Sequence, residues 1–87
     1  MHMKITLRYF ASVREQLGTS QESLELPEGV ATVGAVRTHL TARGGVWAEA
    51  LGTDRAVRTA HQQVMCGPDT VVQDGAEVAF FPPVTGG

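Results

Sequence analysis

The residues best suited to chemistry are the last eight of the printed sequence, 80–87. They read Phe-Phe-Pro-Pro-Val-Thr-Gly-Gly. Glycine has no Cβ, so two closing glycines can thread a narrow channel and present a terminal carboxylate to a partner. The two prolines fix φ and deny sheet pairing, which favours a stiff, extended arm. The pattern predicts that Gly87 is the reacting residue; the alternative is an ordinary frayed chain end.

A carboxylate is a poor acyl donor, because its oxygen is a poor leaving group. Transfer of the Gly87 carbonyl to another group therefore needs activation, and an acyl-adenylate made from ATP would provide it. The sequence has no Gly-x-x-x-x-Gly-Lys-[Ser/Thr] phosphate cradle. We therefore expect this chain to bind no cofactor itself, and a partner to supply the sites for ATP and Mg²⁺.

Composition indicates one small domain with a single core. The 87 residues carry a net charge of −2, which argues against partners such as nucleic acid or an anionic membrane surface. No apolar run approaches the ~20 residues that span a bilayer. The single cysteine, Cys66, excludes an internal disulfide and suits a reducing cytoplasm. His2, His39 and His61 lack the spacing of metal ligands, so no metal site is expected.

The strands and helices that position the tail can be predicted from the spacing of apolar residues along the sequence. Alternation predicts strands at 3–9, around Leu24 and Leu26, at 56–61, 64–66 and 77–81. Spacing of three and four predicts a short helix over 11–17, stopped by Gly18, and a longer helix that begins after Thr32 and ends at Gly44-Gly45. Trp47 and Leu51, four apart, indicate one or two further helical turns.

This order predicts an α+β fold of the β-grasp, ubiquitin-like type. The sheet is mixed, one main helix crosses it, a short helix follows the first strand, and the last strand returns parallel to the first. A ferredoxin-like fold needs a second long helix after residue 60, and the sequence offers none. We expect a domain over residues 1–81 and an extended reactive tail over 82–87.

Strand parity places two aromatic residues outside the core. Phe10 continues the polar set of the first strand, and Phe81 shares a face with Glu77 and Ala79, opposite the core face of Val78 and Phe80. Two outward phenylalanines beside the tail would form an apolar patch for a partner. The alternative for Phe10 is that the strand ends at Tyr9 and the ring turns inward.

Two stretches of the chain, 9–15 and 74–87, carry a resemblance to a known family. They read Tyr-Phe-Ala-Ser-Val-Arg-Glu and Asp-Gly-Ala-Glu-Val-Ala-Phe-Phe-Pro-Pro-Val-Thr-Gly-Gly. The chain resembles the MoaD-type sulfur carriers, the small subunits of molybdopterin synthase, and more distantly ThiS and ubiquitin. It departs from them at Ala76, where Asp is common, and at 60–63, where Ala-His-Gln-Gln replaces Ala-Val-Asn-Gln.

The resemblance implies a role in molybdenum cofactor biosynthesis. A MoeB-type adenylating enzyme would activate Gly87, and a sulfur donor would convert the adenylate to a thiocarboxylate. The thiocarboxylate would deliver sulfur to cyclic pyranopterin monophosphate in a MoaE-type large subunit, within a heterotetramer whose acid and base residues belong to the partners. Met65 would complete the patch. The implied partner-binding residues are Phe10, Met65, Phe81, Pro82, Pro83, Val84, Thr85 and Gly86.

Two other functions use the same features. A sulfur carrier for thiazole, cysteine or tRNA thiolation would share the tail chemistry and differ in its acceptor. A ubiquitin-like modifier would instead join Gly87 to lysines of other proteins. The ending Phe-Phe-Pro-Pro-Val-Thr-Gly-Gly and the short front helix favour the molybdopterin carrier.

Overall fold

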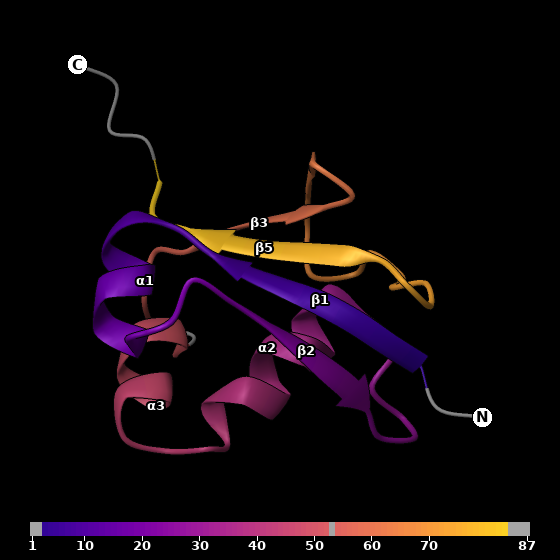
Figure 1. The fold of residues 1–87 in the computed structure, drawn as a ribbon, viewed down its shortest axis with the longest axis horizontal. Helices are drawn as coiled ribbons and strands as arrows, with labels where there is room; N and C mark the ends of the chain where they lie inside the picture. The colour runs from indigo at the N-terminus through magenta and orange to yellow at the C-terminus, as the bar shows by residue number, and fades with distance from the viewer. Residues whose placement is uncertain (1–2, 53, 84–87) are drawn as a thin grey trace.

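The sheet is built around two parallel strands from opposite ends of the sequence. The structure, a computed structural model, describes residues 3–52 and 54–83. Its strands are β1 (Met3–Tyr9), β2 (Gln21–Leu26), β3 (Arg58–His61), β4 (Val64–Cys66) and β5 (Glu77–Phe81). β1 pairs parallel with β5 and antiparallel with β2, and β3 pairs antiparallel with both β5 and β4. The resulting order is β2-β1-β5-β3-β4 (Figure 1).

Three helices cover one face of this sheet and leave the other face open (Figure 1). They are α1 (Ala11–Leu17), α2 (Val33–Thr41) and α3 (Val46–Leu51). α2 is the crossing helix, α1 joins β1 to β2, and α3 is the short helix expected from Trp47 and Leu51. The arrangement confirms the predicted α+β, β-grasp fold, including the parallel return of the last strand.

Local sequence explains where these elements begin and end. The β1 side chains that face the helices are Ile5, Leu7 and Tyr9, each at most 1% exposed, as their alternation predicts. The Thr32 hydroxyl accepts a hydrogen bond from the Ala35 backbone at 3.1 Å and caps α2, an interaction that stabilises a helix by about 1 kcal/mol. Gly18 ends α1 in the left-handed conformation, at φ 75°.

Two boundaries differ from the predictions. β3 begins at Arg58 and not at 56, because Arg58 lies opposite Phe81 and the next partner position is Pro82, which has no N–H to donate. α2 ends at Thr41 and not at Gly44, because the backbone beyond it tightens into three-residue turns, such as Gly44 N–H to Thr41 O at 3.0 Å. Gly44, at φ 75°, then helps to reverse the chain toward α3.

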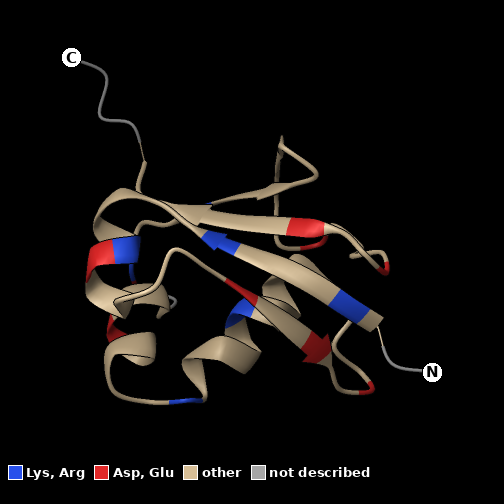
Figure 2. Ribbon diagram, in the orientation of Figure 1, with Lys and Arg blue, Asp and Glu red and all other residues tan. Residues whose placement is uncertain are grey.

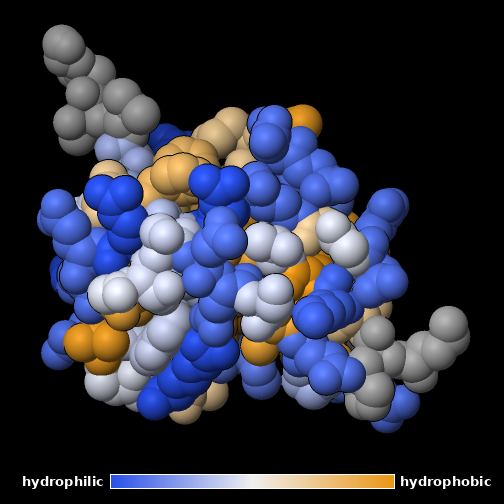
Figure 3. Space-filling view, viewed as in Figure 1, coloured by the Kyte–Doolittle hydropathy of each residue, from blue (hydrophilic) through white to orange (hydrophobic). Residues whose placement is uncertain are grey.

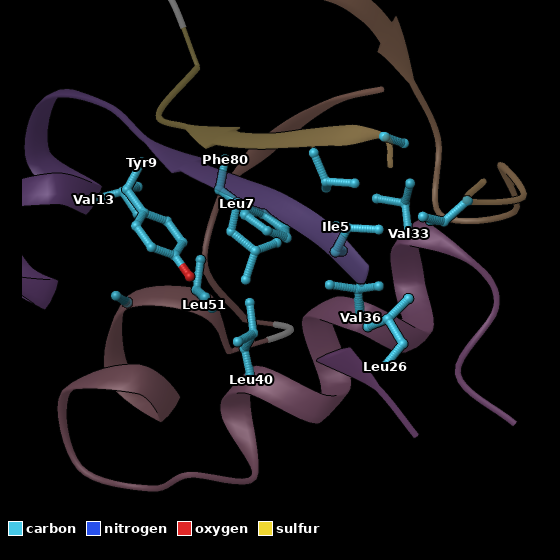
Figure 4. Close-up of a cluster of buried hydrophobic side chains, with 14 residues drawn as sticks. Ile5, Leu7, Tyr9, Val13, Leu26, Val33, Val36, Leu40, Leu51 and Phe80 are labelled. Atoms are coloured by element: carbon cyan, nitrogen blue, oxygen red, sulfur yellow. The ribbon is translucent and has the colours of Figure 1, made fainter. Parts of the chain in front are cut away.

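The core lies between the helices and the face of the sheet that they cover (Figure 4). Phe80 of β5 and Leu7 of β1 are fully buried, and they lie on the side of the sheet that faces Val36 and Leu40 of α2. Burial of such a side chain contributes about 1.5–3 kcal/mol. The two central strands are therefore held by packing as well as by backbone hydrogen bonds.

Tyr9 connects the core to the edge of the sheet. Its hydroxyl donates a 2.7 Å hydrogen bond to Glu22 Oε1, which also accepts one from Arg43 Nη1 at 2.9 Å. The Arg43 guanidinium lies 4.4 Å from the centre of the Trp47 ring, and Trp47 contacts the Tyr9 ring edge-on. Burial raises the pKa of Tyr9 far above its usual range, and the hydrogen bond to Glu22 acts in the same direction.

Arg37 fixes the segment that follows α3. Its Nε donates to the carbonyl of Leu51 at 2.6 Å, and its Nη2 donates to the carbonyls of Gly52 and Arg55 at 2.7 and 3.0 Å. The bond to Leu51 satisfies a carbonyl at the end of α3 that has no helical partner, and the other two bonds hold the segment after α3 against α2. Gly52 is required there, because a Cβ would lie 2.6 Å from the Ala48 carbonyl oxygen.

We predict that the fold is lost at alkaline pH through Tyr9. Its pKa in the folded chain is raised, so only the unfolded chain releases the proton near the ordinary tyrosine pKa of about 10. The contribution of Tyr9 to the free energy of unfolding is therefore complete below that pH. Above it, the free energy of unfolding should fall by about 1.4 kcal/mol per pH unit. Tyr9 is the only tyrosine, so tyrosinate absorbance should appear together with loss of circular dichroism.

The control is Tyr9→Phe, which lowers stability at neutral pH and removes the tyrosine contribution to its decline at alkaline pH. Tyrosinate absorbance near pH 10 in a chain with native circular dichroism would contradict this account of Tyr9.

Candidate functional site

The open face of the sheet carries the side chains that lie opposite the core. Paired residues share a face, so the register brings Arg8, Ala79, Ala60 and Met65 into one row across β1, β5, β3 and β4. Ala79 and Ala60 are only 6% and 7% exposed, although none of the helices described covers this face. Larger neighbours therefore shield the two alanines, which form the floor of a shallow apolar surface.

Phe10 stands outside the core, as the parity of β1 predicts. β1 ends at Tyr9, but Phe10 keeps an extended backbone, at φ −126° and ψ 153°, and its N–H donates to the Phe80 carbonyl at 3.1 Å. The side chain is 39% exposed, and the Arg8 guanidinium lies 5.4 Å from the ring centre. The alternative of an inward ring is thereby excluded.

The backbone just after Phe10 turns without a connecting loop. Ala11, the first residue of α1, adopts φ 51°, a conformation that costs a residue with a Cβ about 1 kcal/mol. The Phe10 carbonyl accepts bonds from the N–H groups of Val13 and Arg14, at 3.1 and 3.3 Å. This sharp turn keeps Phe10 at the end of the sheet, where its backbone also bonds to β5.

Phe81 and Met65 complete an exposed group that we call the apolar patch. Phe81, the last residue of β5, is half-buried and lies opposite Arg58, and Met65 of β4 is 57% exposed. The patch consists of Phe10, Ala60, Met65, Ala79 and Phe81. Figure 3 shows apolar colouring over the end of β5, surrounded by hydrophilic positions. The structure thus places the three predicted residues on one face of the sheet, and two alanines lie on the same face.

The residues after β5 continue from this patch. Pro82 and Pro83 are half-buried and outside any strand. Pro82 lies against a cavity of about 380 Å³ between α1, α3 and the segment before β3, lined also by Ser12, Gln16 and Arg55. Val84, Thr85, Gly86 and Gly87 lie outside the described residues, and so does the predicted reacting group.

Charges of both signs surround the patch. Arg8 Nη1 lies 3.5 Å from Glu77 Oε1, a half-exposed pair that contributes under about 1 kcal/mol. Acidic and basic positions are interspersed over the elements in Figure 2, without a large region of one sign. Within residues 3–52 and 54–83, no three His, Cys, Asp or Glu side chains are grouped to hold a metal ion. None of the helices described could cross a membrane.

The sequence alone did not indicate the alanine floor or the row that contains it. Each alanine is uninformative by itself, and only the pairing of β3 with β5 sets them side by side. Alternation of Val78, Ala79 and Phe80 was the available signal, because an alanine between two core residues has to lie on the open face.

A mixed sheet with a crossing helix, and a C-terminal strand that leads past an exposed apolar patch, defines the chain as a ubiquitin-like β-grasp domain. The sequence model of the ThiS family matches residues 7–87. The chain belongs to the ThiS family.

Two relatives are similar over nearly the whole chain. Both are named molybdopterin synthase sulfur carrier subunit. The one from Escherichia coli strain K12 is 43% identical and the one from Haemophilus influenzae is 39% identical, each over 95% of this chain and 99% of the relative. The resemblance inferred from residues 9–15 and 74–87 is thereby confirmed.

Solved structures agree with the fold. The Haloferax volcanii HVO 2177 protein is 32% identical, with a TM-score of 0.80 over 99% of this chain and 88% of that one. One chain from the complex of subunits 1 and 2 of the molybdopterin-converting factor from Helicobacter pylori is also similar. It superposes with a TM-score of 0.64 at 22% identity, over 98% of this chain and 100% of that one. The second match concerns the fold alone.

Proposed function

We propose that this chain is the sulfur carrier of a molybdopterin synthase. The observation that carries the proposal is its 43% identity, over almost its full length, to a protein named as that carrier. The geometry is consistent with such a role, because an exposed apolar patch adjoins the strand that leads to residues 82–87. The patch would bind the partner, and Gly87 would carry the sulfur.

β5 is well suited to hold a reactive tail. It pairs with β1 on one side and β3 on the other, and Val78 and Phe80 are fully buried beneath it. The point where the tail begins is therefore fixed relative to the patch. A fixed origin lowers the entropy cost of bringing a reacting group into a partner's active site.

The proposed chemistry proceeds through the terminal carboxylate of Gly87. A MoeB-type enzyme, which supplies the sites for ATP and Mg²⁺, would join the carboxylate to AMP and release pyrophosphate. A sulfur donor would then displace AMP and leave a thiocarboxylate. In a MoaE-type large subunit, the sulfur would pass to cyclic pyranopterin monophosphate, and water would restore the carboxylate. This chain contributes binding and delivery, and its partners contribute acid and base groups.

The partner-binding residues in this proposal are those of the patch and the tail. Phe10, Phe81 and Met65 would be buried on docking, with Ala60 and Ala79 as the floor beneath the contact. Pro82, Pro83, Val84, Thr85 and Gly86 would pass through the partner's channel. We further propose a domain over 1–81 with a tail over 82–87, assembly as two small and two large subunits, and action in the cytoplasm.

Two related functions would keep the tail chemistry or the fold. A carrier for thiazole, cysteine or tRNA thiolation would be loaded in the same way and would fail to transfer to cyclic pyranopterin monophosphate. A protein modifier would yield isopeptide-linked ladders in cell extract. These outcomes separate the alternatives from the proposed role.

We predict that Phe81→Ala weakens the complex with the large subunit. Phe81 is half-buried at the centre of the proposed interface, and truncation of such an aromatic anchor commonly costs 2 kcal/mol or more. The dissociation constant measured by calorimetry should rise by about 30-fold. The circular dichroism of the variant should stay native.

The matched control is Val71→Ala. Val71 is 65% exposed and lies outside the patch, opposite Thr32 at the start of α2. It should leave the affinity unchanged. An unaltered dissociation constant for Phe81→Ala would remove Phe81 from the interface.

A second prediction concerns Gly87. Gly87→Leu, or addition of one residue after Gly87, should reduce sulfur loading by about 100-fold or more, because either change displaces the reacting carboxylate in a narrow channel. Loading is measured by intact mass after incubation with the adenylating enzyme, ATP and the sulfur donor.

The control is Gly67→Leu, which makes the same substitution at a different glycine. A Cβ at Gly67 would contact nothing within 4 Å. It should load at the normal rate. Retention of loading by both Gly87 variants would refute the carrier mechanism.

A further inference from the structure

A second concave site lies between α2 and the β3–β4 edge of the sheet. A cavity of about 220 Å³ opens between the first turn of α2 and the strands β3 and β4. Its apolar wall includes Val33, Val57 and Pro68, and the Cys66 thiol lies at its margin, half-buried. Mostly apolar walls with a few polar groups are typical of small-molecule sites.

The cavity is cationic within an acidic protein. The chain has a net charge of −2, yet Arg37 and Arg58 both line this cavity, and none of the described residues that line it is acidic. Guanidinium groups stay protonated and present planar donors that match a carboxylate. The charge of the site therefore favours an anion.

Arg37 is held in place before any ligand arrives. Its Nε and Nη2 donate to three backbone carbonyls at 2.6–3.0 Å, so the guanidinium cannot move far from the cavity. Burial lowers its pKa from the usual arginine value, which reflects the cost of a charge shielded from water, and the nearby carboxylate of Asp54 acts in the opposite direction without cancelling it. An anion in the cavity would offset that cost without the loss of side-chain entropy that a free arginine would suffer.

Arg58 contributes the second charge from the opposite wall. It is the first residue of β3, it lies beyond the residues that pair with β4, and its exposed side chain lines the cavity. At the same wall, the Thr59 hydroxyl donates to the Cys66 carbonyl at 3.0 Å, and the thiol lies 3.7 Å from the Thr59 oxygen. These contacts hold the thiol at the wall of the cavity.

We propose that this cavity binds a small free carboxylate with an apolar body. The carboxylate would lie between Arg37 and Arg58, and the apolar body would contact Val33, Val57 and Pro68. A dianion such as phosphate fits the site less well, because its hydration would be lost against an apolar wall. The cavity shares Met65 with the apolar patch, but the proposal involves no step of the Gly87 chemistry and stands independently of the proposed function.

Cys66 provides the first test, because it is the only cysteine in the chain. Its thiolate displaces iodide from iodoacetate, which is anionic, or from iodoacetamide, which is neutral and nearly the same size. We expect the ratio of the two alkylation rates, iodoacetate to iodoacetamide, to be about tenfold higher in the folded chain than in the urea-unfolded chain. Equal ratios in the two states would overturn the proposal.

The second test is competition by a ligand of the proposed class. Benzoate should slow alkylation of Cys66 in a saturable manner and shift the methyl resonances of Val33 and Val57, whereas benzyl alcohol, which lacks the charge, should do neither. Absence of protection by benzoate would also overturn the proposal, whatever the rate ratio.

A matched pair of variants tests whether Arg58 provides the positive charge that attracts the anion. Arg58→Gln should lower the rate ratio about fivefold and weaken protection by benzoate. Arg14→Gln makes the same change on the exposed face of α1, outside the cavity, and should leave both unchanged. Arg37 is left intact, because it also holds the end of α3. Equal effects of the two variants would show a general charge effect and contradict binding in this cavity.

Discussion

The structure depends on the parallel pairing of β1 with β5. This pairing joins the two ends of the sequence, places β5 between β1 and β3, and buries Phe80 beneath the centre of the sheet. The backbone continues the pairing past β1, where Phe10 N–H donates to the Phe80 carbonyl. As a result, both phenylalanines of the apolar patch lie at the end of the sheet from which residues 82–87 continue.

The same constraint separates the two faces of the sheet. The buried face is completed by α2 and by Tyr9, whose ring stacks near Phe80 and whose hydroxyl bonds to Glu22. The middle of the open face carries small side chains on β5 and β3, where Ala79 and Ala60 lie side by side, and the charged Glu77 and Arg58 lie on the same face. Such a face beside β5 supports the proposed role, in which this chain binds a partner that completes the reaction.

Periodic patterns predicted most of the fold, because burial on one face leaves a repeating signal. The alternation of Ile5, Leu7 and Tyr9 located β1, and the spacing of Val33, Val36 and Leu40 located α2. The start of β3 was missed, since it is set by Pro82, which follows β5 and lies far from β3 in the sequence. The hydrogen bonds from Arg37 to the segment after α3 were also missed, as were the two alanines on the open face and the cationic cavity. Each depends on contacts between residues far apart in sequence, which leave no local pattern.

The central claim is that Gly87 carries sulfur to cyclic pyranopterin monophosphate. The most direct measurement is the intact mass of the thiocarboxylate form, before and after it is mixed with the large synthase subunit and that substrate. The account predicts that the mass returns to that of the carboxylate while the dithiolene product appears. A thiocarboxylate that remains loaded in the presence of both would contradict the molybdopterin assignment.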